Sequence, residues 1–309
     1  MRLVGNATLF CLLAVVWGTA YVVINIGLRT VPPAFLAALR FDVAALVLFG
    51  YVAARGVAWR PRAADAYPIL VGGTLLVAVT NAFLFAGQRH VTSAVAAVIV
   101  GLVPVVTPAL NRLVTGEERL SVLGIGGVLV GFGGVAVIAH PDPANLVADA
   151  YGVALVSVSA FAWALGTVLR YDRKPGLSRP AEGAWMMLVG SVLLHAVSLV
   201  RRETIPTAWP LEAVAAIGYL AIVSGAVGYL VYLVLVDALG PVEVSLLQYV
   251  VPLFAALVGW FTLGEVLSAT TVAGFCLIVV GFVLVKREAL RTALRRWQVR
   301  RERSRTNNR

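Results

Sequence analysis

Residues 91–113 read VTSAVAAVIVGLVPVVTPALNRL, and the first charged side chain in this run is Arg112. A helix needs about 20 mostly apolar residues to cross the hydrocarbon core of a bilayer. The run is long enough, and its apolar residues are continuous instead of alternating as in the strands of a membrane barrel. The stretch therefore predicts a membrane-spanning helix.

The composition of the chain extends this interpretation to the whole protein. Of its 309 residues, 60% are hydrophobic and 13% are charged, whereas soluble domains carry about 25% charged residues. In lipid, every backbone polar group must be satisfied within the protein, so continuous apolar runs form helices. The sequence predicts an all-α integral membrane protein.

Ten segments have the length and hydropathy of a span, and turn residues such as Pro32-Pro33 and Gly240-Pro241 separate them. Proline marks such joints because it cannot continue a preceding helix. The predicted spans are Ala7–Leu28, Pro33–Val52, Tyr67–Gly87, Val91–Leu113, Ser121–Ala139, Tyr151–Arg170, Ala181–Val200, Leu211–Val236, Val242–Phe261 and Ser268–Val285.

The basic residues predict the orientation and the environment of the chain. The net charge is +10, and ten of the 25 Lys and Arg residues lie in the tail, residues 286–309. Of the other basic residues, ten fall on the side of the N-terminus and four on the opposite side, so both termini are expected in the cytoplasm of a cell with an inner (plasma) membrane. The basic tail is expected to contact anionic lipid. Nucleic acid is not expected as a partner, because the remaining basic residues only punctuate apolar runs.

The chain also repeats itself at a nearly constant offset. Matching positions, at offsets of 146 to 148 residues, are Trp17 and Trp163, Pro104 and Pro252, Gly116-Glu117 and Gly264-Glu265, Gly127 and Gly274, and Gly134 and Gly281. Residues 1–140 would form a first repeat of five spans, residues 150–285 a second, and residues 286–309 the tail. Because five is odd, the second repeat is expected upside down relative to the first. Such inverted repeats recur in secondary transporters, whose substrate site lies between the halves.

Three patterns together resemble a known family. They are Val16-Trp17-Gly18-Thr19-Ala20 followed by Pro32-Pro33 and Leu39-Arg40-Phe41, the paired proline with Gly-Glu, and the paired glycines. In order and spacing they resemble the EamA-like branch of the drug/metabolite transporter superfamily over roughly residues 7 to 285. The resemblance implies ten helices in two inverted repeats, with a central cavity lined mainly by spans 1, 3, 4, 6, 8 and 9. It also implies export of amino acids, related metabolites or toxic compounds, driven by a gradient and without a cofactor.

Candidate substrate-cavity residues are the polar, aromatic and proline positions nearest the middle of these spans. They are Trp17, Tyr21, Asn81, Pro104, Trp163, Tyr229, Tyr232, Gln248, Tyr249 and Pro252. Ligand cavities are mostly apolar and aromatic, with a few polar groups that fix orientation. Ordinary core packing is the alternative for each side chain, and a purely structural kink is the alternative for the two prolines.

Arg40 and Asp42 are the charged pair inside a span, and they are the candidates for ion coupling. Charges at this depth are costly and often functional. For Arg40 the alternative is a structural bond to neighbouring carbonyls. His195 is expected to be a hydrogen-bonded helper on a peripheral span. Glu117 and Glu265 are expected to stabilise the N-terminus of the helix that follows each of them.

Other functions receive less support. No HExxH, GxSxG or GxxxxGK[ST] pattern occurs, so an enzyme, a metal site or an ATP-driven pump is not expected. A lipid flippase or scramblase is the closest alternative to a transporter of small organic metabolites. The sequence leaves open the substrate, the coupling ion and whether the chain is a monomer or a homodimer.

Overall fold

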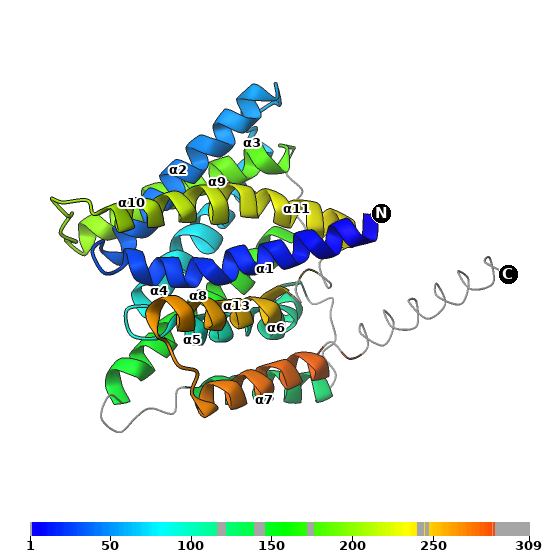
Figure 1. Ribbon diagram of the computed structural model, residues 1–309. Helices are drawn as coiled ribbons and strands as arrows, with labels where there is room; N and C mark the ends of the chain where they lie inside the picture. Colours follow the sequence, from blue (N-terminus) through cyan, green and yellow to red (C-terminus); the bar gives the residue numbers. More distant parts are fainter. Residues whose placement is uncertain are drawn as a thin grey trace.

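The computed structural model describes residues 2–115, 122–138, 146–171, 176–239, 244, 247–285 and 287 (Figure 1). Every regular element among these residues is a helix, and the helices pack together as a bundle. Seven helical segments are long and apolar enough to cross a membrane, and three shorter apolar helices accompany them. The expected all-α membrane fold is thus observed, while the count of ten spans stays a prediction.

The elements follow one another with short joints. Their bounds are α1 (Arg2–Gly27), α2 (Pro33–Ala54), α3 (Ala63–Val71), η1 (Gly72–Val79), α4 (Thr80–Gly87), α5 (Ser93–Val100), α6 (Val103–Thr115), α7 (Val122–Ile138), α8 (Leu146–Tyr171), α9 (Arg179–Val200), α10 (Leu211–Gly218), η2 (Tyr219–Val227), α11 (Gly228–Leu239), α13 (Leu247–Leu263) and a last helix, Ala269–Val285. We call the end of the bundle at which α1 begins the proximal end and the end at which α1 finishes the distal end.

Local capping explains where several helices begin. Pro33 is the first residue of α2, where its missing N–H costs nothing. Glu203 then accepts hydrogen bonds from the backbone N–H of Ala34 at 3.1 Å and of Phe35 at 2.9 Å. The hydroxyl of Thr92 accepts from the backbone N–H of Val95 at the start of α5. The first turns of these helices therefore keep their exposed donors satisfied.

Two long spans contain π-helical segments at matching places. η1 lies between α3 and α4, and η2 lies between α10 and α11. The two segments begin at residues 72 and 219, which are separated by the repeat offset seen in the sequence. Thr80 donates to the carbonyl of Leu75 at 2.7 Å, and Asn81 donates to that of Val77 at 2.8 Å. These side chains add hydrogen bonds to carbonyls of η1.

Equivalent helices of the two halves make equivalent contacts. α2 packs against α9, and α5 packs against α13. The contact of α1 with α13 has its counterpart in the contact of α8 with α6. The contact of α8 with η1 and α4 likewise has its counterpart in that of α1 with η2 and α11.

The paired glycines bring α7 against the last helix. A Cβ at Gly127 would lie 2.7 Å from the carbonyl oxygen of Gly281, and a Cβ at Gly281 would lie 2.6 Å from that of Gly127. Gly134 and Gly274 approach each other equally closely, at 2.6 and 2.5 Å. The glycines that match in sequence thus permit backbone contact between helices, as small residues do in membranes.

The two matched prolines occupy different local settings. The helix that includes Pro104 is interrupted at Gly101 and Leu102, and Pro104 is the second residue of α6 after the break. Pro252 instead lies inside the unbroken α13. The break precedes Pro104 because proline is well accommodated in the first turn of a helix and poorly in its interior.

Candidate functional site: a cavity inside the bundle

A cavity of about 410 Å³ lies among the helices. Its wall is formed by residues of α1, α2, η1, α4, α5, α8, α9, η2, α11 and α13. The resemblance implied mainly spans 1, 3, 4, 6, 8 and 9, and α2 and α9, which pack against each other, also contribute to the wall. The volume falls in the range of pockets that bind small organic molecules.

The structure brings most of the candidate residues together at this cavity. Those in its wall are Trp17, Tyr21, Arg40, Asn81, Trp163, Tyr229, Tyr232 and Gln248. They come from six different spans, so only the folded bundle places them side by side. Whether they bind substrate stays a prediction.

Four candidate residues lie outside the cavity wall. Pro104 and Pro252 are buried against neighbouring helices, and Tyr249 packs its ring 4.9 Å from that of Phe282. Asp42 faces α9, where its Oδ2 lies 2.7 Å from Nε2 of His195. Pro104, Tyr249 and Pro252 are thus not part of the cavity wall, and a role of Asp42 in ion coupling stays a prediction.

The aromatic part of the wall is held in place by close packing. The indole of Trp17 lies 5.5 Å from the ring of Tyr232, and its N–H donates to the carbonyl of Ser224 at 3.3 Å. A Cβ at Gly183 would lie 2.6 Å from the ring of Tyr229. The missing side chain at Gly183 thus lets the Tyr229 ring lie directly against α9.

Arg40 is a charged residue of the cavity wall that is buried among apolar groups. Its side chain is only 9% exposed, and its guanidinium carbon lies 4.6 Å from the ring centroid of Phe41 and 5.7 Å from that of Phe85. Its Nε is enclosed and has no hydrogen-bond partner. Neither the expected bonds to carbonyls nor a path to the surface is seen for this nitrogen.

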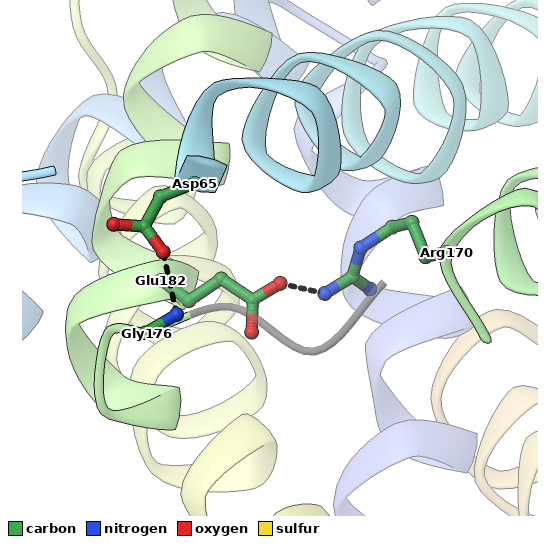
Figure 2. A network of polar contacts seen from close by, with 4 residues as sticks. All are labelled: Asp65, Arg170, Gly176 and Glu182. Carbon is green, nitrogen blue, oxygen red and sulfur yellow. Dashed lines mark hydrogen bonds and ion pairs between the residues drawn. The ribbon is translucent and has the colours of Figure 1, made fainter. Parts of the chain in front are cut away.

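Charged residues at or near the ends of two predicted spans line the proximal part of the cavity. Arg170 of α8 forms an ion pair with Glu182 of α9 (Figure 2), and Arg179 lies on the same wall. Thr167 and Arg179 are exposed while they line the cavity, so the cavity opens at the proximal end. Hydropathy missed these residues because a charge within one turn of a span's end looks like a loop charge.

Beside this mouth, Asp65 holds the chain that enters α9. Its carboxylate accepts a hydrogen bond from the backbone N–H of Gly176 at 2.6 Å (Figure 2). It accepts another from the backbone N–H of Arg62 at 2.8 Å. The side chain is 1% exposed. A buried carboxylate needs such donors, so Asp65 ties the start of α3 to the segment before α9.

Beyond the distal end of the cavity lies a polar network that we call the distal seal, formed by Asn25, Gln88, Ser93 and Glu265. Glu265 accepts hydrogen bonds from the backbone N–H of Ser93 at 3.0 and 3.1 Å, from its hydroxyl at 2.9 Å and from the Asn25 amide at 3.3 Å. Gln88 donates to the carbonyl of Tyr21 at 2.9 Å and to Asn25 at 3.2 Å. The seal therefore joins α1, α4, α5 and the segment after α13.

This network corrects the role expected for Glu265. Its carboxylate stabilises the N-terminus of α5, which precedes it by 172 residues, and not the start of the helix that follows it. The principle of a carboxylate at a helix N-terminus was right, but sequence proximity indicated the wrong helix. Glu117, its counterpart in the repeat, and the basic tail beyond residue 287 lie outside the described residues.

The fold and the cavity define the class of protein: a helical membrane protein with a solute-sized internal chamber. The profile of the EamA-like transporter family matches residues 6–139 and again residues 150–287. The chain belongs to the EamA-like transporter family and is a membrane transporter.

Relatives agree with this assignment. A protein of Escherichia coli strain K12, named an uncharacterized inner membrane transporter YedA, is 30% identical over 276 residues that cover 88% of each chain. A Chlamydia trachomatis serovar L2 protein, named an S-adenosylmethionine/S-adenosylhomocysteine transporter, is 27% identical over 289 residues, covering 90% of this chain and 88% of that one. A crystal structure of a protein with 21% identity matches with a TM-score of 0.62 over 92% of this chain and 98% of the other, which shows a shared fold.

Proposed function

We propose that this transporter exports small organic metabolites, such as amino acids or related compounds, by alternating access and without ATP. The observation that carries the proposal is the cavity itself, which opens at the proximal end and has the hydrogen-bonded distal seal beyond its other end. This is the arrangement of a transporter with its substrate chamber open to one side of the membrane. If both termini are cytoplasmic, as the distribution of basic residues favours, the chamber opens to the cytoplasm.

The internal symmetry supports an alternating mechanism. The helix contacts exchange in pairs, the π-helical segments begin at matching positions, and the matched glycines of the two halves pack on each other. Because each half contacts the other through equivalent helices, the molecule can adopt a second state in which each half takes the conformation that the other half has here. In that state the chamber would open at the distal end.

The test is solute flux from proteoliposomes that contain the purified full-length chain. The vesicles are loaded with a defined pool of amino acids, nucleosides and amines, and the solutes that leave are identified by mass spectrometry with and without a pH gradient. We expect selective, saturable loss of one chemical class. Flux no faster than from protein-free vesicles would refute the proposal. Movement of a fluorescent phospholipid in the same vesicles would instead favour the flippase alternative.

A further inference from the structure

One charged residue of the cavity wall, Arg40, has no ion-pair partner among the residues that the structure describes. The wall contains three arginines and one acidic residue, namely Arg40, Arg170, Arg179 and Glu182. Glu182 is already committed to its ion pair with Arg170. Near the closed end, within the residues the structure describes, no carboxylate forms an ion pair with Arg40. Arg40 is therefore a charge in the chamber wall that the described acidic residues do not pair.

The guanidinium of Arg40 lies well inside the bundle and not at its surface. Arg40 is the eighth residue of α2, so it lies roughly 10 Å along the helix axis from the distal end. An arginine remains charged at any accessible pH, and a charge at this depth is unfavourable unless it is paired or solvated. The two phenylalanine rings beside it stabilise the cation in part, but they supply no hydrogen-bond acceptor.

We propose that Arg40 is the anion-binding residue of the chamber, and that the transported solutes carry a carboxylate that its guanidinium binds near the closed end. The inference rests on the proposed transport function and names the chemical class of its substrate. A guanidinium binds a carboxylate through two parallel hydrogen bonds. One carboxylate would balance the charge of Arg40.

The other residues of the cavity wall indicate which groups the rest of the solute carries. Trp17, Trp163, Tyr229, Met186 and Met187 present apolar and aromatic surface between Arg40 and the proximal mouth. The amide nitrogen of Asn81 donates to its own helix, so its oxygen is the atom left to accept a hydrogen bond from a solute. A small carboxylate with an apolar body, with or without an amino group, fits this arrangement of charges and surfaces.

The test compares matched acids and amides in one flux experiment. Proteoliposomes are loaded with an equimolar mixture of phenylalanine, tryptophan, leucine and methionine, their carboxamides, the corresponding acids without an amino group, and phosphoethanolamine. Wild-type protein is expected to release carboxylic acids faster than their carboxamides by roughly 10- to 100-fold, the effect of a hydrogen bond to a charged group. This arm needs no substitution and is independent of the folding of any variant.

Variants then assign the preference to Arg40. Arg40→Gln is expected to lose the acid preference, and Arg40→Lys is expected to keep part of it, because lysine retains the charge without the planar fork. Arg89→Gln is the matched control, because Arg89 is exposed at the distal end and lies outside the cavity wall. Gel filtration and thermal unfolding report whether each variant is folded.

The outcomes separate the two proposals. No solute leaving faster than from protein-free vesicles would refute the transport function itself. Equal release of acids and carboxamides, preferred release of phosphoethanolamine, or an acid preference that survives in folded Arg40→Gln would leave transport standing and overturn the role of Arg40. Loss of acid preference in Arg40→Gln alone, with Arg89→Gln unchanged, would establish it.

Discussion

The distal seal should control which end of the chamber is open, and Glu265→Gln tests this. The carboxylate accepts hydrogen bonds through both oxygens from the backbone N–H of Ser93. Glutamine keeps the shape but has a single acceptor oxygen and no charge, so at least one charge-assisted hydrogen bond is lost. Such a bond contributes about 1.5–3 kcal/mol, which corresponds to a roughly 10- to 150-fold shift toward the distally open state.

Thiol labelling measures this shift. Ile24 lines the cavity beside the seal and is 2% exposed, so Ile24→Cys reports access from the distal side. The reporter is placed in a chain in which both natural cysteines, Cys11 and Cys276, are replaced by serine, since both are exposed. A membrane-impermeant thiol reagent is then supplied on the distal side of oriented vesicles. We expect Glu265→Gln to raise the labelling rate of Ile24→Cys by an order of magnitude or more.

Glu203→Gln is the matched control for this experiment. Glu203 stabilises the start of α2 through two backbone hydrogen bonds at the same end of the bundle, but it takes no part in the seal. An unchanged labelling rate in folded Glu265→Gln would refute the assigned role of the seal. An equal increase in Glu203→Gln would show general loosening of the distal end and would refute it as well.

Two further predictions concern packing and coupling. Gly127→Ala should lower the melting temperature and the yield of folded protein, because the new methyl group would lie 2.7 Å from the carbonyl oxygen of Gly281. Gly126→Ala is the control and should leave both unchanged, because a Cβ there would have no atom within 4 Å. Equal melting temperatures of the two variants would contradict the helix contact. Asp42→Asn removes the charge beside His195, and if this pair carries the coupling proton, flux should lose its stimulation by a pH gradient while downhill flux continues. Retained stimulation would exclude Asp42 as the coupling site.

The general architecture and much of the chamber could be predicted because they depend on local features. Long apolar runs require helices in lipid, and aromatic residues near the middle of spans, such as Trp17 and Tyr229, are the ones positioned to line a central chamber. The repeat offset identified the matched glycines, but their contact with each other is a finding of the structure. Each of these features is visible within a single segment or in its matching copy.

Features that depend on contacts between distant segments could not be predicted. Glu265 and Ser93 are separated by 172 residues, and nothing in their local sequences connects them. The proximal ion pair of Arg170 and Glu182 was missed because charges near span ends look like loop charges. The π-helical turns were missed because a change in hydrogen-bond register leaves hydropathy unchanged.

The central claim is that solute crosses the membrane through the chamber, and a blocking experiment tests it most directly. Thr167 is exposed at the proximal mouth and lines the chamber, so Thr167→Cys in the chain without Cys11 and Cys276 places a single thiol there. Flux of the solute pool is measured before and after reaction with a bulky maleimide from the proximal side. The account predicts that the modification stops flux and that a reducible adduct of similar size restores it on reduction. Undiminished flux from fully modified protein would contradict the chamber as the transport path.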